Sequence, residues 1–219
     1  MPAAIYVFDA YGTLFDVHSA IGKHRDKVGP DADRMSEVWR TKQLEYSWTL
    51  TLSGQYQDFW ALTGQALDFA LARFPSVDKG LKPQLMDAYY KLGAFPDAKD
   101  TLRRLRDKGC RTGILSNGSP AMLKGAVEAA GLGDLLDAVL SIDSLKMFKP
   151  RPEVYDLVIN FFRCRHDEVA FISSNRWDVM GAANVGFKPV WINRAGNPDE
   201  YGKAERVVTS LSALPDLAV

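Results

Sequence analysis

The stretch AAIYVFDAYGT, residues 3–13, joins a short apolar run to a polar turn. The run Ala3–Phe8 is rich in aliphatic and aromatic side chains, which is typical of a strand buried on both faces. It ends at Asp9, and the turn Asp9–Thr13 follows directly. We therefore expect a buried parallel strand that carries Asp9 to the edge of a sheet.

Strands and helices alternate along the second part of the chain. Further strands are expected at Cys110–Leu115, Ala138–Ile142, Glu168–Ser173 and Pro189–Ile192. Helices are expected at Asp97–Lys108, Pro120–Ala130, Pro152–Phe162 and Asp178–Val185. This order predicts an α/β fold, with a Rossmann-like parallel sheet covered by helices on both faces.

A helical block interrupts the alternation after the first strand. Apolar side chains recur there at spacings of three and four, which predicts helices from about Asp31, from about Tyr56 to Phe74, and over Pro83–Leu92. We expect a core domain of residues 1–15 and 96–219. Residues 16–95 should form an inserted helical cap subdomain over the carboxyl edge of the sheet.

Composition narrows the classes of partner and location. The chain has 219 residues, which suits one compact core with an inserted subdomain. Its 27 basic and 27 acidic residues give no net charge, so neither nucleic acid nor an anionic membrane is expected as a partner. A cytoplasmic location is expected, because no signal peptide is evident and no apolar run approaches the roughly 18 residues of a membrane span.

Four polar clusters accompany the expected strand ends. They are Asp9–Thr13, Ser116–Gly118, Lys149-Pro150 and Ser173–Asp178. A single cluster of this kind would serve to cap the next helix. Ligands of open α/β sheets bind beyond the carboxyl ends of the strands, so four clusters at one edge predict a common crevice.

The same clusters resemble the motifs of a known superfamily. DxxGT, SNG, KP and SSNxxD are similar to those of the haloacid dehalogenase superfamily. Longer stretches resemble its type II branch, the L-2-haloacid dehalogenases: FDAYGTLFDV (8–17), WRTKQLEYSW (39–48), LSNG (115–118), FKPRPEVY (148–155) and SSNRWD (173–178). The resemblance spans almost the whole chain, and it implies a haloacid dehalogenase-like fold and a homodimer.

The resemblance also implies a reaction. Small (S)-2-haloacids would be hydrolysed to (R)-2-hydroxyacids and halide through an aspartyl ester on Asp9, with fluoroacetate as a further candidate substrate. Tyr11 favours this branch, because superfamily phosphatases carry there a second Asp that protonates the departing alkoxide. A halide leaves as the anion and needs no proton.

No metal or other cofactor is expected. Superfamily phosphatases bind Mg²⁺ through a GDxxxD cluster, whereas this chain has Ser-Ser-Asn followed by Asp178, with one carboxylate fewer. The alternative function is a Mg²⁺-dependent phosphatase of small phosphate esters. A third hypothesis is a binding module that has kept the fold without catalysis.

Six residues are expected to carry the chemistry: Asp9, Lys149, Asp178, Asn175, Ser173 and Thr13. By resemblance, Asp9 attacks the halogen-bearing carbon, and Lys149 keeps its carboxylate ionised. Thr13 and Ser173 orient Asp9 by hydrogen bonds. In the second step, Asp178 either activates the hydrolytic water or pairs with Lys149, and Asn175 acts beside it.

Eight further residues are expected to bind substrate or halide: Tyr11, Arg40, Leu44, Phe59, Ser116, Asn117, Tyr155 and Trp177. By resemblance, Arg40 and Asn117 receive the departing halide, with Phe59 packed beside it. Ser116 and backbone N–H groups near Tyr11 and Asn117 hold the substrate carboxylate. The other three would complete the site: Leu44 on the same helix face as Arg40, Tyr155 as a family site tyrosine, and Trp177 along the pocket wall.

Overall fold

A single six-stranded parallel sheet forms the centre of the computed structural model, which describes residues 5–201, 204 and 206–217. The strands are β1 (Ile5–Phe8), β2 (Arg111–Ser116), β3 (Ala138–Ser141), β4 (Val169–Ser173), β5 (Lys188–Ile192) and β6 (Val207–Val208). Their order is β3-β2-β1-β4-β5-β6, and every neighbouring pair is parallel. The predicted α/β sheet is confirmed, although Ala3 and Ala4 of the first expected strand lie outside the described residues.

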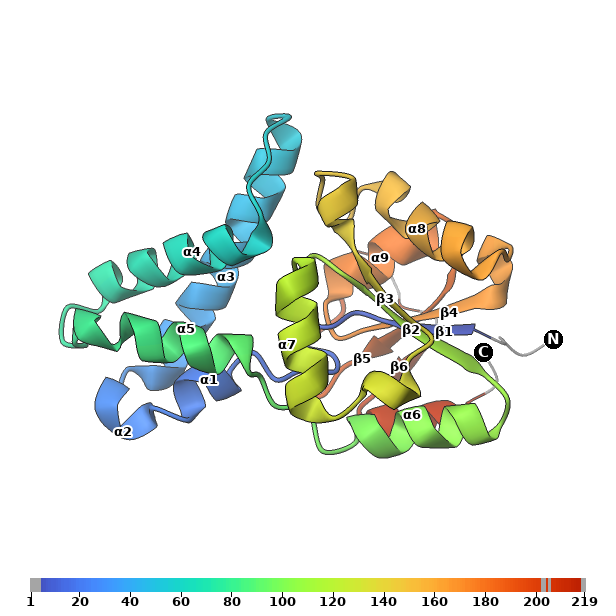
Figure 1. Ribbon diagram of the computed structural model, residues 1–219, viewed down its shortest axis with the longest axis horizontal. Coiled ribbons are helices and arrows are strands. Elements are labelled where there is room, and N and C mark those ends of the chain that lie inside the picture. The colour runs from blue at the N-terminus through green and yellow to red at the C-terminus, as the bar shows by residue number, and fades with distance from the viewer. Residues whose placement is uncertain (1–4, 202–203, 205, 218–219) are drawn as a thin grey trace.

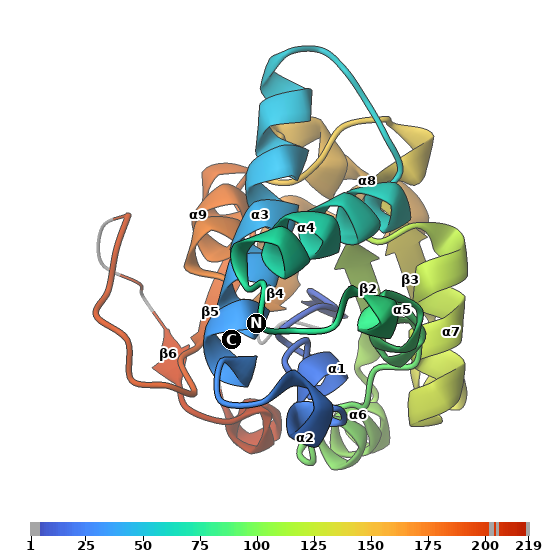
Figure 2. The ribbon, with the colours of Figure 1, turned by 90° about the vertical axis from the view of Figure 1, so that its left-hand side faces the viewer.

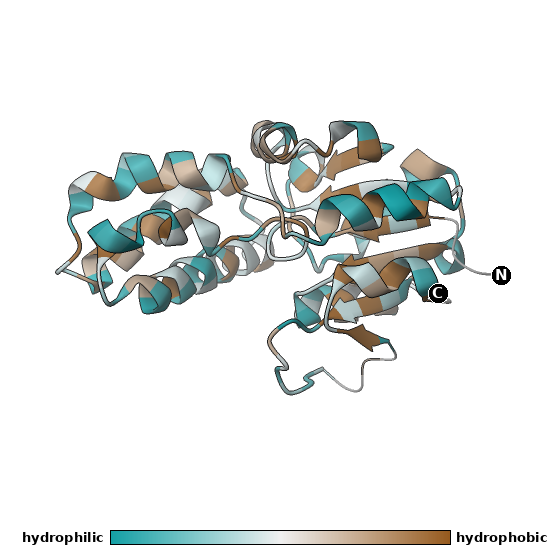
Figure 3. Ribbon diagram, turned by 90° about the horizontal axis from the view of Figure 1, so that it is seen from below, coloured by the Kyte–Doolittle hydropathy of each residue, from teal (hydrophilic) through white to brown (hydrophobic). Residues whose placement is uncertain are grey.

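Strand β1 lies in the middle of the sheet, between β2 and β4. The residue that follows it, Asp9, therefore lies between the ends of these two strands. Phe8 is in register with Ile114 of β2 and with Ile172 of β4. All four residues of β1 are buried, as expected for a strand with helices on both faces. In Figure 3 the strands are mostly brown, which marks them as the hydrophobic layer of the core.

Two pairs of helices cover the sheet. Helices α6 (Ala98–Asp107) and α7 (Pro120–Ala130) cover one face, and α8 (Pro152–Phe162) and α9 (Arg176–Asn184) cover the other (Figure 1). The chain adds β2 and β3 on one side of β1 and then β4 and β5 on the other side. Because crossovers between parallel strands are right-handed, the helices of the two halves cover opposite faces of the sheet. The predicted bounds of α7 and α8 are confirmed, because each helix has Pro at its first position and a left-handed residue after its last.

Five helices lie between β1 and α6 in the chain: α1 (Ser19–Gly22), α2 (Arg25–Val28), α3 (Ala32–Leu52), α4 (Phe59–Arg73) and α5 (Lys82–Tyr90). We call them the helical segment. They lie together at the end of the molecule toward which the strands run (Figures 1 and 2). The two connections to the core run side by side, because Phe95 N–H donates to Leu14 O (2.8 Å) and Asp16 N–H donates to Gly93 O (3.0 Å).

Some element bounds differ from those predicted. Helix α4 begins at Phe59 rather than near Tyr56, because the Asp58 carboxylate accepts hydrogen bonds from two N–H groups of the first turn. Helix α9 begins at Arg176, so that Asp178 lies in its first turn. The sequence did not predict α1, α2 or β6, since elements of two to four residues show no periodicity.

No helix within the described parts of the chain combines the length and the hydrophobicity that a membrane span requires.

Candidate active site

The predicted clusters meet at the carboxyl edge of the sheet. Asp9 follows β1, Asn117 follows β2, and Asn175 follows β4, while Lys149 comes from the loop before α8. The Lys149 N–H donates to Asn117 Oδ1 over 3.0 Å, which ties the loop to the end of β2. Four separate parts of the sequence are therefore joined by hydrogen bonds at one edge of the sheet, as predicted.

Lys149 pairs with two carboxylates at once. Its Nζ donates to Asp9 Oδ1 (2.8 Å) and to Asp178 Oδ2 (2.6 Å), and a third hydrogen bond goes to Leu115 O (3.1 Å). The side chains of Lys149 and Asp178 are fully buried, and that of Asp9 is 6% exposed. Burial alone would lower the pKa of Lys149, but the two carboxylates outweigh this effect and raise it, so the ammonium form is favoured.

The second oxygen of the Asp9 carboxylate is also held by donors. Asn175 Nδ2 donates to Asp9 Oδ2 over 2.7 Å, and Thr13 Oγ1 donates to the same oxygen over 3.2 Å. Thr13 Oγ1 in turn accepts from Ser174 N–H (2.8 Å), so its own hydrogen is directed at Asp9. Donors on both oxygens fix the direction of the Asp9 carboxylate, as a nucleophile requires.

The expectation for Ser173 is wrong in one respect. Among the described residues, its hydroxyl does not contact Asp9; Ser173 Oγ instead accepts from the backbone N–H of Asn175 over 3.1 Å. The reason is the local turn, in which a serine hydroxyl bonds the N–H two residues later. Ser173 therefore bonds the backbone of Asn175, whose side chain donates to Asp9.

Behind Lys149, the predicted tyrosine is a partner of Asp178. Tyr155 Oη donates to Asp178 Oδ1 over 2.7 Å, and the ring is fully buried against Phe171 and Phe187. Burial raises the pKa of Asp178 to about 6, and the neighbouring Lys149 lowers it in opposition. A raised pKa gives the Asp178 carboxylate a higher proton affinity, which suits a general base.

Arg40 extends from α3 to the loop after β1. Its Nη2 donates to Tyr11 O (2.9 Å) and lies 3.5 Å from Asn175 Oδ1, while Nη1 donates to Gln43 Oε1 (2.8 Å). The guanidinium therefore contacts the loop Asp9–Thr13, which follows β1. Arg40 and Tyr11 are 29 positions apart in the sequence. A cavity of about 260 Å³ lies against Arg40, Gly12 and Asn175.

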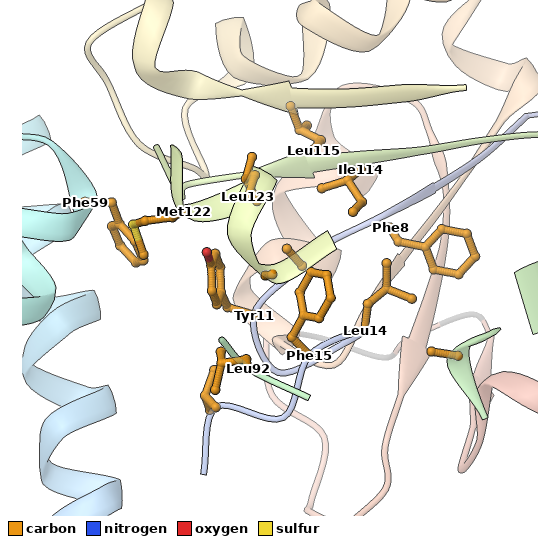
Figure 4. Packing of buried hydrophobic residues seen from close by; sticks show 14 of the residues in the cluster. Phe8, Tyr11, Leu14, Phe15, Phe59, Leu92, Ile114, Leu115, Met122 and Leu123 are labelled. Carbon is orange, nitrogen blue, oxygen red and sulfur yellow. The ribbon is translucent and has the colours of Figure 1, made fainter. Parts of the chain in front are cut away.

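Aromatic rings form the apolar wall of the site. The Tyr11 ring stacks on Tyr89, with ring centroids 5.7 Å apart. It also lies beside Phe59, with ring centroids 6.1 Å apart (Figure 4). Phe59 also packs on Phe148 at 5.7 Å. Burial raises the pKa of Tyr11 well above its usual value, so that its hydroxyl keeps its proton and does not act as the acid of a phosphatase.

Three of the expected residues remain, namely Ser116, Trp177 and Leu44. Ser116 Oγ accepts from Gly118 N–H (3.1 Å) and is fully buried. Trp177 packs edge-on against Trp48 (5.4 Å between centroids), and Lys149 Nζ lies 6.0 Å from the Trp177 ring centre. Leu44 is half-buried on α3, one turn beyond Arg40, and its place in the pocket stays a prediction.

Sequence reasoning missed two buried partners of the site. Gln43 accepts from Arg40, and Tyr89 stacks on Tyr11. Gln43 had one visible signal, since it follows Arg40 by three residues and Trp39 by four and so lies on the helix face that they define. Tyr89 had none, because its partner is distant in the chain.

The donor set around Asp9 does not fit Mg²⁺. Magnesium needs several oxygen ligands with open lone pairs. Here the Lys149 ammonium lies between the two carboxylates, and N–H and O–H groups of Asn175 and Thr13 point at the other oxygen of Asp9. Within the described ranges, no three His, Cys, Asp or Glu side chains gather in a way that could hold a metal ion.

Comparison with known proteins places this site in a family. The family model for haloacid dehalogenase-like hydrolases matches residues 4–186. The chain belongs to that family. Its relatives include (S)-2-haloacid dehalogenase 1 of Pseudomonas sp. (strain CBS-3), 48% identical over 99% of this chain and 96% of the relative, and (S)-2-haloacid dehalogenase 4A of Burkholderia cepacia, 51% identical over 95% and 91%.

A solved structure of the family has the same fold. The L-2-haloacid dehalogenase from Xanthobacter autotrophicus, with chloropropionic acid covalently bound, is 35% identical with a TM-score of 0.90 and covers 98% of this chain and 97% of its own. Within the haloacid dehalogenase-like hydrolases, the chain therefore belongs with the (S)-2-haloacid dehalogenases. The resemblance identified from the sequence is confirmed.

Proposed function

We propose that this chain hydrolyses small (S)-2-haloacids to (R)-2-hydroxyacids and halide through an ester on Asp9. One observation carries the proposal. The Asp9 carboxylate is held by Lys149, Asn175 and Thr13, and the residue two positions after it, Tyr11, is not an acid. Such a site presents a carboxylate nucleophile, but at the position of Tyr11 it has no acid to give a proton to the group that leaves in the first step. Halide is a leaving group that needs none.

In the first step, a carboxylate oxygen of Asp9 attacks the halogen-bearing carbon in line. The new C–O bond forms as the carbon–halogen bond breaks, and the halide leaves with the electron pair. The configuration at carbon is inverted in this step. Arg40, with Asn117, receives the halide, because a guanidinium in a water-poor pocket is a good anion site.

In the second step, water attacks the carbonyl carbon of the Asp9 ester. One water proton passes to Asp178 as the new C–O bond forms. The bond between the carbonyl carbon and the oxygen that came from Asp9 then breaks, and this oxygen takes the proton from Asp178 and leaves as the hydroxyl of the hydroxyacid. Asp9 loses the second water proton to solvent and is a carboxylate again. A carboxyl group whose pKa is raised to about 6 has the proton affinity that this transfer needs. Asn175 positions the ester, and Lys149 balances the returning negative charge on Asp9.

Substrate recognition is assigned to groups at the ends of β1 and β2. Ser116 and the backbone N–H groups beside Tyr11 and Asn117 would hold the substrate carboxylate. Phe59 and the ring of Tyr11 exclude water from the reacting carbon. Fluoroacetate is included as a candidate substrate, and it needs stronger stabilisation of the leaving fluoride than chloride does.

We also infer that residues 16–95, which contain the helical segment, act as a cap on a core of residues 1–15 and 96–219. Two contacts across the join support this: Arg40 reaches Tyr11 O, and Phe59 packs on Phe148. A cytoplasmic location remains our inference, and fractionation of cells that express the tagged chain tests it.

A homodimer is proposed as well. An apolar hollow of about 390 Å³ involves both the cap and the core, with lining residues that include Trp48, Leu52, Trp177 and Met180. Leu52 is 88% exposed beside it, which favours a covering partner. Sedimentation at micromolar concentration should give a dimer for the wild type and a monomer for Leu52→Glu. A monomeric wild type would contradict the proposal.

The function is tested by incubating the purified protein with L-2-chloropropionate in EDTA and measuring chloride. The D enantiomer and fluoroacetate are run alongside, and the product is resolved on a chiral column. Chloride from the L form with D-lactate as product is expected. Failure to release halide from any of the three substrates would refute the function for them.

The alternative is a Mg²⁺-dependent phosphatase of small phosphate esters. The same preparation is therefore assayed with a panel of phosphate esters, with and without Mg²⁺. Magnesium-dependent phosphate release faster than chloride release would favour that alternative. No observation at the site supports it over dehalogenation.

A further inference from the structure

A buried amide in the helical segment is the immediate partner of Arg40. Gln43, on α3, is fully buried. A buried amide must satisfy both its oxygen and its NH₂ group. Gln43 Oε1 accepts from Arg40 Nη1 (2.8 Å), Gln43 Nε2 donates to Thr63 Oγ1 (2.6 Å), and Tyr89 Oη lies 3.1 Å from each amide atom.

The direction of this amide is fixed from α4. Thr63 Oγ1 donates its single hydrogen to Phe59 O over 2.7 Å, so the same oxygen can only accept from Gln43. The NH₂ group of Gln43 must therefore face Thr63, and the carbonyl oxygen must face Arg40. A flipped amide would place N–H groups against the guanidinium and leave two donors unsatisfied.

We propose that Gln43 is a positioning residue that holds the Arg40 guanidinium over the loop after β1 without neutralising its positive charge. This deepens the proposed function, in which Arg40 receives the halide, and it rests on that function. A series of hydrogen bonds runs from Phe59 O through the side chains of Thr63, Gln43 and Arg40 to Tyr11 O. It links α4 to the loop that carries Asp9.

The chemical type of the residue matters as much as its position. A carboxylate at residue 43 would hold the guanidinium equally well but would neutralise its charge by a buried ion pair. The neutral amide fixes Arg40 with a dipole and leaves its full charge available to an anion. Gln43 is therefore expected to affect halide more strongly than it affects substrate entry or folding.

Four variants separate these contributions. Gln43→Glu keeps the acceptor and adds a negative charge, and Thr63→Val removes the group that directs the amide at nearly constant volume. Thr63→Ser keeps the hydroxyl and is the matched control for Thr63→Val. Gln65→Glu makes the same charge change on the exposed side of α4 and controls for charge alone.

The measurements are the inhibition constant for bromide and kcat for a pair of substrates, 2-bromopropionate and 2-chloropropionate. We expect the bromide inhibition constant to rise about 10–100-fold in Gln43→Glu and by a smaller factor in Thr63→Val, the effect of one weakened charge-assisted hydrogen bond or more. The loss of kcat should be greater for chloride, the poorer leaving group. Thr63→Ser and Gln65→Glu should match the wild type within about twofold, a difference of less than 0.5 kcal/mol by RT ln 2.

The proposal would be overturned if folded Gln43→Glu retained the wild-type bromide affinity and leaving-group ratio. A purely structural role would lower the melting temperature and slow both substrates equally, which also contradicts the proposal. A crystal structure of each variant soaked in bromide gives a readout that needs no turnover. Arg40 should leave Tyr11 O, or lose bromide, in Gln43→Glu and Thr63→Val only.

Failure of the proposed function gives a different pattern. If the wild type released no halide from any haloacid, the dehalogenase assignment would fall, while the bromide soaks would still decide the role of Gln43. An Arg40 guanidinium in the same position with the same bromide density in all variants would refute the positioning role alone.

Discussion

Tyr155 donates a hydrogen bond to Asp178 over 2.7 Å, on the side of the carboxylate opposite to Lys149. Lys149 uses Oδ2 and Tyr155 uses Oδ1, so both oxygens of a fully buried carboxylate have donors. Burial nevertheless raises the pKa of Asp178 to about 6. The residue proposed to take a proton from water therefore has a higher proton affinity than an ordinary carboxylate.

The first prediction concerns the acid side of the pH profile. If Asp178 must be ionised to accept the proton, kcat should fall as the pH drops through about 6. The Tyr155 hydrogen bond lowers the pKa of Asp178, so Tyr155→Phe should raise that pKa and move the acid limb to higher pH. Steady-state kcat is measured against pH for both proteins. An unchanged limb in Tyr155→Phe would exclude Asp178 as the titrating base.

The same pKa shift predicts how stability changes with pH. The folded pKa of about 6 exceeds the reference value of 3.8, so the folded state binds the proton more tightly than the unfolded state. This contribution to stability is complete below about pH 3.8 and is lost as the pH rises through 6. Asp178→Asn should remove it, so urea midpoints of the variant should depend less on pH within that window. Parallel pH curves for the two proteins would contradict the shift.

Removal of the shared cation should destabilise the fold. Lys149→Met leaves Asp9 and Asp178 buried without a counter-charge, and breaking such a buried pair costs about 3–5 kcal/mol. The loss should be smaller below about pH 6, where Asp178 can take up a proton. Urea unfolding measures it, with Lys146→Met as the control from the same loop, because Lys146 makes an exposed ion pair. Equal losses in both variants would show that the buried cation has no special weight.

Chelation should leave turnover unchanged. The Lys149 ammonium already supplies positive charge between the carboxylates, and Asn175 and Thr13 direct hydrogens at Asp9 Oδ2. Halide release is followed after dialysis against EDTA and again after addition of Mg²⁺. A rate that falls on dialysis and returns with Mg²⁺ would mean that a metal enters the site in spite of this donor set.

Much of this site could be predicted because its residues follow strands. A buried strand that ends in a polar turn has one outcome in a parallel sheet, and Asp9 and Asn117 lie where that rule puts them. Helix α7 was predictable to the residue, since Ser119, Pro120 and Gly131 mark its ends by their own chemistry. Local patterns of this kind need no knowledge of distant partners.

The partners inside the site could not be predicted in the same way. The sequence left two duties open for Asp178, and in the structure its carboxylate pairs with Lys149 and accepts from Tyr155. Ser173 was expected to hydrogen-bond Asp9. Its hydroxyl instead accepts from the N–H of Asn175, which is only two residues away in the sequence. The sequence places Gln43 on the same face of α3 as Arg40 and Trp39, but it does not show that Gln43 is buried. That burial depends on the packing of α4 and α5 against α3.

The last prediction concerns the close approach of Gly118 to the ring of Tyr11. A Cβ atom on Gly118 would lie 2.6 Å from Tyr11 Cε2, far inside van der Waals contact, although the backbone there does not require glycine. The ring cannot move aside, since it is stacked on Tyr89 and faces Phe59. Gly118→Ala should therefore destabilise the fold by about 1–3 kcal/mol, the usual cost of overpacking.

Activity should fall together with stability. The Tyr11 carbonyl accepts from Arg40 and from Asn175, so a displaced Tyr11 disturbs two residues of the proposed reaction. We expect kcat for L-2-chloropropionate to drop about tenfold or more, as positioning errors of this size do. Gly133→Ala is the control, because its Cβ would approach no atom closer than 4.0 Å. If Gly118→Ala and Gly133→Ala had the same melting temperature and kcat, Tyr11 would be free to move, and its ring could not form the rigid wall proposed for the site.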